Sequence, residues 1–166
     1  MKCTKGKIIL YQAIGRFTIY TFKVSGEENC FDQFINKFEN HSQYKKEFET
    51  ILAVIREFCK RGIDFRKFRL NGEKTVEALL AGAYNLRLYC IPLGTFELLV
   101  GNGDVKTARR VQDCINCKPH WELMVALEAE LMSRIQNSEI WRDESENRKD
   151  VEVLAGQLLF ELGNCD

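Results

Sequence analysis

Two adjacent segments with helical periodicity constrain the fold of this chain most. In the segment FDQFINKF, residues 31–38, four apolar side chains fall at i, i+3, i+4 and i+7, the spacing of one face of an amphipathic helix. The next segment keeps this period from Ser42, a residue type that favours the N-cap position, to Gly62, which ends it. The short link at residues 40–42 predicts that the two segments form a helical hairpin.

Strand-period segments lie on both sides of this hairpin. Lys7–Val24 is rich in β-branched and aromatic residues, and Gly15-Arg16 divides it into the two arms of a β-hairpin. After the helices, three further segments have strand character and are separated by short turns, so they predict an antiparallel meander. These segments are Thr75–Leu80, Asn85–Ile91 and Phe96–Gly101.

The C-terminal third differs in composition. Pro119–Ile135 has a helical apolar stripe with proline at its start. Glu139–Asp150 carries five acids and three bases with almost no apolar content, which indicates a linker or solvated loop. Val151–Leu162 is expected to form a last short helix, ended by Gly163.

These patterns predict an α+β fold. Residues 1–138 are expected to form one domain, in which an antiparallel β-sheet of about four to five strands carries the helical hairpin on one face and is followed by C-terminal helices. Residues 139–166 are expected to be an acidic C-terminal extension with a short helix.

The formal net charge of zero conceals two halves of opposite sign. Residues 1–118 hold 20 Lys and Arg against 13 Asp and Glu, whereas residues 119–166 hold 4 against 11. The cations gather in two clusters, which favour a phosphate-rich partner, although a solvated face is the alternative. The first cluster includes Arg66, Lys67, Arg69 and Lys74, and the second consists of Lys106, Arg109 and Arg110.

The seven cysteines follow no framework spacing, so reduced thiols packed as small hydrophobic side chains are the default expectation. The pair Cys114-Ile-Asn-Cys117 leaves a metal or redox role open. Zinc needs four ligands, however, and a second pair at the usual spacing is absent. We therefore expect no metal and no cofactor.

No apolar stretch approaches the roughly 20 residues that cross a membrane. No export signal is recognisable at the N-terminus, which carries Lys2, Lys5 and Lys7. We therefore expect a cytoplasmic protein with no membrane association.

Four short motifs, taken with the predicted order of elements, resemble a known family. They are FRKFRLNG at residues 65–72, VEAL at 76–79, NLRLY at 85–89 and DVKTARR at 104–110. Together they resemble the RelE/ParE superfamily of bacterial toxins, in particular its HigB-like, phage-derived branch. The resemblance covers roughly residues 7–135.

The resemblance implies the toxin of a bacterial toxin–antitoxin system, an endoribonuclease that cleaves mRNA on the ribosome. It also implies a helix-turn-helix antitoxin as partner. Arg87 would stabilise the phosphate in the transition state, because a guanidinium matches two phosphate oxygens. Lys106, Arg109 and Arg110 would contact phosphate or transfer protons. The resemblance further implies five residues that bind RNA without a catalytic role, namely Arg66, Lys67, Arg69, Lys74 and Tyr89.

Two other classes of function remain open. The first is a non-catalytic protein-binding module with a toxin-like fold, since Val76 and Ala78 are apolar where ribosome-dependent members place lysines. In that case Arg87 would lie on a solvated sheet face and Tyr89 would pack in the core. The second is a metal or redox protein that uses Cys114 and Cys117.

Overall fold

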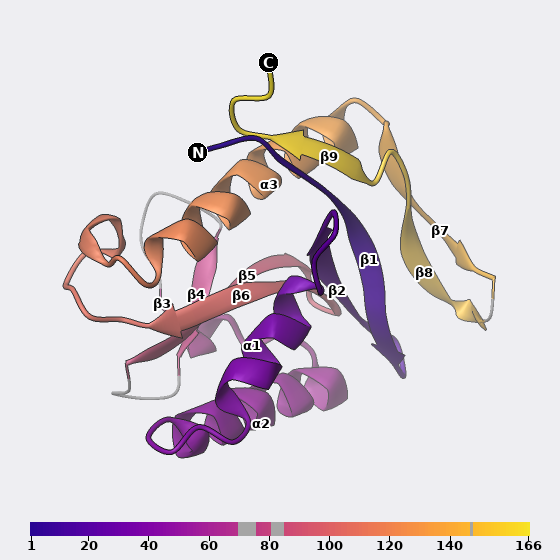
Figure 1. Cartoon of the computed structure of the whole chain (residues 1–166). Coiled ribbons are helices and arrows are strands. Elements are labelled where there is room, and N and C mark those ends of the chain that lie inside the picture. The colour runs from indigo at the N-terminus through magenta and orange to yellow at the C-terminus, as the bar shows by residue number, and fades with distance from the viewer. Residues whose placement is uncertain (70–75, 81–84, 147) are drawn as a thin grey trace.

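The computed structural model describes residues 1–69, 76–80, 85–146 and 148–166. Three long helices, two short 3-10 turns and nine strands are found in this part of the chain (Figure 1). In chain order the elements are β1 (Thr4–Ile14), β2 (Phe17–Val24), α1 (Cys30–Phe38), α2 (Lys45–Arg61), η1 (Phe65–Lys67), β3 (Phe68–Arg69), β4 (Glu77–Leu80), β5 (Leu86–Gly94), β6 (Glu97–Val105), η2 (Val111–Asp113), α3 (Lys118–Gln136), β7 (Ile140–Ser145), β8 (Arg148–Gly156) and β9 (Leu159–Leu162).

Seven of the strands form one sheet in the order β3-β4-β5-β6-β2-β1-β9. The predicted hairpin at β1–β2 and the predicted meander β4-β5-β6 are both present. The sheet is nevertheless mixed, because β2 pairs with β6 in parallel. It is also larger than predicted, because β3 and β9 add a strand at each edge. The α1–α2 hairpin carries the chain from β2 across one face of the sheet to its far edge, and the meander then returns to β2. A parallel pair requires a long crossover of this kind.

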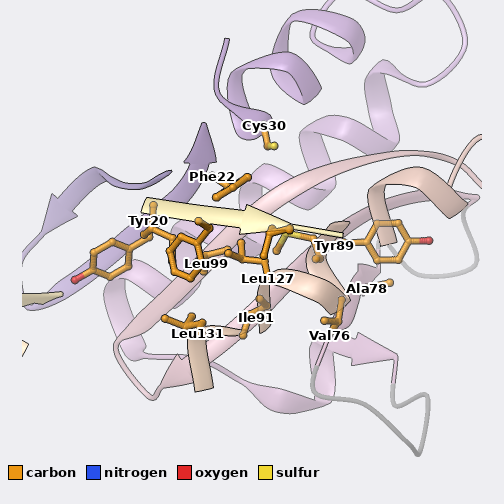
Figure 2. Packing of buried hydrophobic residues seen from close by; sticks show 14 of the residues in the cluster. Tyr20, Phe22, Cys30, Val76, Ala78, Tyr89, Ile91, Leu99, Leu127 and Leu131 are labelled. Atoms are coloured by element: carbon orange, nitrogen blue, oxygen red, sulfur yellow. The ribbon is translucent and has the colours of Figure 1, made fainter. Parts of the chain in front are cut away.

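The sheet separates two cores. On one face, α1 and α2 bury a phenylalanine-rich set, which we call the α1–α2 core; it includes Phe17, Phe34, Phe38, Phe48, Phe58, Leu86, Leu88 and Leu98. On the other face, α3 packs on what we call the α3 core, which includes Tyr20, Tyr89, Ile91, Leu99, Met124, Leu127 and Leu131. Figure 2 shows Leu127 and Leu131 lying among residues that the strands contribute. The helical hairpin on one face was predicted, and α3 covers the second face.

The two helices of the hairpin lie where the sequence predicts them, apart from the start of α2. Asn29 caps α1, because its side-chain oxygen accepts the N–H of Asp32 at 2.9 Å. Ser42 is not the N-cap of α2, which begins at Lys45. The N–H groups of Gln43 and Tyr44 donate to His41 Nδ1 instead, which closes a turn ahead of the helix.

The predictions for residues 139–162 are wrong. The expected loop and the expected helix at Val151–Leu162 are the hairpin β7–β8 and the strand β9. Ile140, Val151 and Leu154 are buried, and the acidic residues Asp143, Glu144, Asp150 and Glu152 are exposed. The backbone N–H of Leu154 donates to the Tyr20 hydroxyl at 3.0 Å, a contact between residues 134 positions apart. Strand pairing with distant residues therefore overrides the local polarity of this segment.

The two ends of the chain lie side by side (Figure 1). β9 pairs antiparallel with β1, and Cys3 forms a disulfide with Cys165, which corrects the expectation of reduced thiols for these two residues. Cys30, Cys59, Cys90, Cys114 and Cys117 are free thiols. Within the described ranges, no helix has the length and apolar character needed to span a membrane.

Candidate functional site

The candidate site lies at the end of β6 that extends beyond its neighbour β2. The parallel pairing runs from Glu97 to Val100, whereas β6 continues to Val105. Along this extension α1 takes the place of β2, and it contributes two polar side chains one helical turn apart. Asn102 Nδ2 donates to Gln33 Oε1 at 3.1 Å, and Lys37 forms an ion pair with Asp104. The α1 helix thereby fixes the polar end of β6.

Arg87 lies directly opposite Asp104 in the β5–β6 ladder. Its neighbours Leu86 and Leu88 belong to the α1–α2 core, so alternation along the strand places Arg87 on the α3 face. The side chain is buried, at 8% exposure, and its Nη1 donates to the carbonyl oxygen of Leu86 at 3.1 Å. A cation held in this way has a fixed position, unlike a lysine on a loop.

The strand pairing also brings Lys106 to this end of the sheet. Its backbone N–H donates to the carbonyl oxygen of Asn85 at 2.8 Å, two residues before Arg87. Gly103 permits the close approach of the two strands, since a Cβ there would lie 1.7 Å from the carbonyl oxygen of Arg87. Arg87 and Lys106, two of the predicted catalytic residues, are therefore neighbours in the structure.

His120, in the first turn of α3, borders the same region. Burial lowers the pKa of its imidazole, and this effect outweighs the opposing influence of the Asp104 carboxylate, while Lys37 lowers the pKa further. A pKa below 6.5 leaves His120 neutral at neutral pH and able to accept a proton. His120 also lines a cavity of about 580 Å³ together with Gln33 and Asn102.

The other predicted cations lie at the surface. Arg109 and Lys67 are exposed, and two exposed arginines have carboxylate partners close in sequence. Arg110 Nε lies 2.8 Å from Asp113, and Arg66 Nε lies 2.9 Å from Asp64. Lys67 borders a second cavity, of about 390 Å³, along α2. The backbone of Arg69 pairs with Ala78 at the edge of the sheet, and Lys74 lies outside the described residues.

Tyr89 and the two cysteines of the C-x-x-C motif lie beneath the segment that carries the second cationic cluster. Tyr89 is 4% exposed and belongs to the α3 core, so it packs rather than presenting its ring to the surface. Cys117 Sγ donates to the carbonyl oxygen of Asp104 at 3.4 Å. Among the described residues, no group of three or more His, Cys, Asp or Glu side chains has an arrangement that could hold a metal ion.

Lys37, Asp104 and His120 are the residues that sequence analysis missed as site candidates. Lys37 and Asp104 are 67 positions apart, and nothing local in either segment indicates that they pair. Asp104 lies in the DVKTARR motif, which was the one available signal. No family model matches this chain, and comparisons with curated proteins and with solved structures found no match.

Proposed function

We propose that this protein is a toxin of the RelE/ParE type that binds mRNA and cleaves it on the ribosome. The observation that carries the proposal is that strand pairing brings the backbones of Arg87 and Lys106 to one end of β5 and β6, where Asp104 lies opposite Arg87 and influences His120. The order of elements supports it: a strand hairpin, two helices, three antiparallel strands and a helix follow one another, as the resemblance requires.

RNA cleavage without a cofactor needs three groups. A base removes the proton of a ribose 2′-hydroxyl, whose oxygen attacks the adjacent phosphorus, and cations stabilise the charge on the pentavalent phosphate. The bond from phosphorus to the 5′-oxygen then breaks, and that oxygen takes up a proton from an acid, which leaves a 2′,3′-cyclic phosphate. In our proposal His120 is the base, Arg87 holds the phosphate, and the Lys106 ammonium is the acid.

The burial of Arg87 sets a condition on this chemistry. At 8% exposure Arg87 is buried, so in our proposal an RNA phosphate reaches the guanidinium only after a neighbouring segment moves aside, and Lys106–Arg110 is the segment we propose. This segment follows the end of β6 and contains neither helix nor strand. RNA binding is therefore expected to begin at the exposed Arg109 and to proceed to Arg87 as the segment is displaced.

The proposed antitoxin is a small helix-turn-helix protein with an acidic or amphipathic segment that covers the cationic clusters. The chain's own acidic end is a less suitable cover for the first cluster. β9 lies at the opposite edge of the sheet from β3, and the Arg66 side chain is 89% exposed. The β7–β8 hairpin docks instead on the β5–β6 turn, where Arg142 Nε lies 2.7 Å from Glu97.

Growth of a bacterial host tests the proposal. Expression of the wild-type protein without an antitoxin is expected to stop growth, and Arg87→Ala is expected to restore it. Arg56→Ala is the matched control, because it removes an exposed arginine of α2 far from the site. Normal growth with the wild-type protein, shown to be soluble and folded, would contradict the toxin assignment.

A further inference from the structure

Cys114 and Cys117 are close together at the start of α3. Cys117 is the residue that precedes the helix, and Cys114 ends the short turn η2. The two thiols are near enough for each to influence the pKa of the other, and both are fully buried. Of the two residues between them, Ile115 is 84% exposed, so the pair lies beneath a single surface loop rather than in the centre of the protein.

The two thiols hold the chain segment that carries the second cationic cluster. Cys114 Sγ accepts from the backbone N–H of Thr107 at 3.4 Å, lies 3.6 Å from its hydroxyl, and donates to the carbonyl oxygen of Val105 at 3.8 Å. Cys117 Sγ donates to the carbonyl oxygen of Asp104. These contacts join the start of α3 to the end of β6, on either side of Lys106.

The surroundings of the two sulfurs give the two thiols different pKa values. Burial raises the pKa of Cys114, but hydrogen bonds from the Thr107 amide and from Cys117 outweigh it and bring the pKa to about 7. Burial raises the pKa of Cys117 to about 12. Near neutral pH, Cys114 is therefore the attacking thiolate and Cys117 the protonated partner. Thiolate character decides which cysteine of such a pair reacts first.

We propose that Cys114 and Cys117 are a redox-active dithiol that closes to a disulfide on reaction with a small-molecule disulfide, and that closure releases the segment Thr107–Arg110. In this proposal the surface loop that carries Ile115 opens first, because the Cys114 sulfur has no exposed surface. The Cys114 sulfur then attacks one sulfur of glutathione disulfide, whose S–S bond breaks as one glutathione leaves. The Cys117 sulfur then attacks Cys114 Sγ and displaces the second glutathione. Two protein thiols are oxidised, one disulfide is reduced, and the two thiol protons end on the glutathiones.

Closure removes the hydrogen bonds that depend on the thiols. A disulfide has no S–H to donate from Cys117 to Asp104, and its sulfur is a weaker acceptor for the Thr107 amide than the Cys114 thiolate. The segment is then held less firmly at its base. The dithiol does not depend on the proposed function, but its effect on RNA binding rests on it, because the released segment carries the cations Arg109 and Arg110.

The test uses the full chain in glutathione redox buffers, followed by alkylation of free thiols and peptide mass spectrometry. The tryptic peptide that begins at Val111 contains both cysteines and no other, so closure appears as the loss of two hydrogens from this peptide. We expect closure in the wild type, a glutathione adduct on Cys114 in Cys117→Ser, and no adduct on Cys117 in Cys114→Ser. Cys59→Ser is the control, because this half-buried thiol lies on α2 and is expected to leave closure unchanged.

Amide hydrogen exchange of residues 105–110 measures the second half of the proposal. Oxidised wild type is expected to exchange faster there than reduced wild type, whereas Cys114→Ser exchanges equally in both buffers. Two free thiols under oxidising conditions would contradict the proposal that Cys114 and Cys117 form a disulfide. An adduct that forms as readily on Cys117 as on Cys114 would contradict the proposal that Cys114 reacts first. Closure without faster exchange would overturn its link to the segment. Neither readout involves RNA, so both hold even if the toxin proposal fails.

Discussion

Lys37 of α1 forms an ion pair with Asp104 of β6, at the point where β6 has lost its strand neighbour β2. The Asp104 side chain is only 13% exposed, and the same residue lies opposite Arg87. Its carboxylate also raises the pKa of His120, against the larger effect of burial. One carboxylate thus connects α1, both strands of the site and the start of α3.

Loss of the ion pair is expected to destabilise the protein. Lys37→Ala leaves the nearly buried Asp104 carboxylate with one partner fewer, and the free energy of unfolding should fall by about 1 kcal/mol, since half of the lysine is exposed. Lys60→Ala is the control, because Lys60 and Glu57 are both mostly exposed and 3.6 Å apart. Urea denaturation measures both variants. Equal decreases in the free energy of unfolding would contradict the expectation that the Lys37–Asp104 ion pair stabilises the protein more than the exposed Lys60–Glu57 pair.

The close approach of β5 and β6 is expected to exclude any side chain at position 103. In Gly103→Ala the new methyl group would lie 1.7 Å from the Arg87 carbonyl oxygen, so the strands must separate, at a cost of about 1–3 kcal/mol or more. Gly94→Ala is the matched glycine, because its nearest new contact is the end of the Glu97 side chain at 3.8 Å. Thermal denaturation compares the two. A normal melting temperature for Gly103→Ala would contradict the described register.

Truncation in the α3 core is expected to be costly. Leu127 has no exposed surface, and Leu127→Ala should lower the free energy of unfolding by about 2–5 kcal/mol through lost burial and the cavity left behind. Met132→Ala, on the same helix, removes a side chain that is 37% exposed, and it should cost much less. Guanidinium denaturation of both variants provides the measurement. Similar costs would place α3 elsewhere than on the sheet.

The stability of the protein is expected to decrease in acid because of His120. Its pKa in the folded protein lies below its ordinary value of 6.5, so the unfolded chain binds a proton more readily. The contribution is fully present above pH 6.5 and is lost as pH falls from there through the folded pKa. His120→Gln should lose less stability than the wild type over this window. Denaturant midpoints of the two proteins, measured on either side of this window, test the expectation, and equal losses of stability would contradict it.

Much of the fold could be predicted because its signals are local. The apolar stripes of α1, α2 and α3 and the turn at Gly15 each lie within a short segment, and the structure confirms them. The β7–β8 hairpin was missed because it has few apolar residues among its charged ones. Ile140 and Leu154 are buried in the α3 core, and the backbone of Leu154 contacts Tyr20, which is distant in sequence. The parallel pairing of β2 with β6 depends on the path of the whole chain.

For the site as well, features set by a short segment could be predicted, and features that depend on distant contacts could not. Arg87 could be found as a charge within an apolar strand. Its nearness to Lys106 could not, because the third predicted strand ends at Gly101, whereas β6 continues to Val105 and Lys106 then bonds to Asn85. Lys37 and His120 could not be found, because the helices that carry them reach Asp104 only through tertiary packing. The C-x-x-C pair could be seen in the sequence, but its hydrogen bonds to Thr107 could not.

RNA cleavage by purified protein tests the central claim most directly. Ribosome-bound mRNA is incubated with the wild type, Arg87→Ala and Arg56→Ala, each shown to be folded by circular dichroism, and the RNA ends are mapped. We expect cleavage by the wild type and by Arg56→Ala, with cyclic phosphate ends. Cleavage by Arg87→Ala should be slower by about 10²–10³-fold, the usual cost of one lost transition-state contact. Intact RNA with the wild type, or equal rates for all three proteins, would contradict the account.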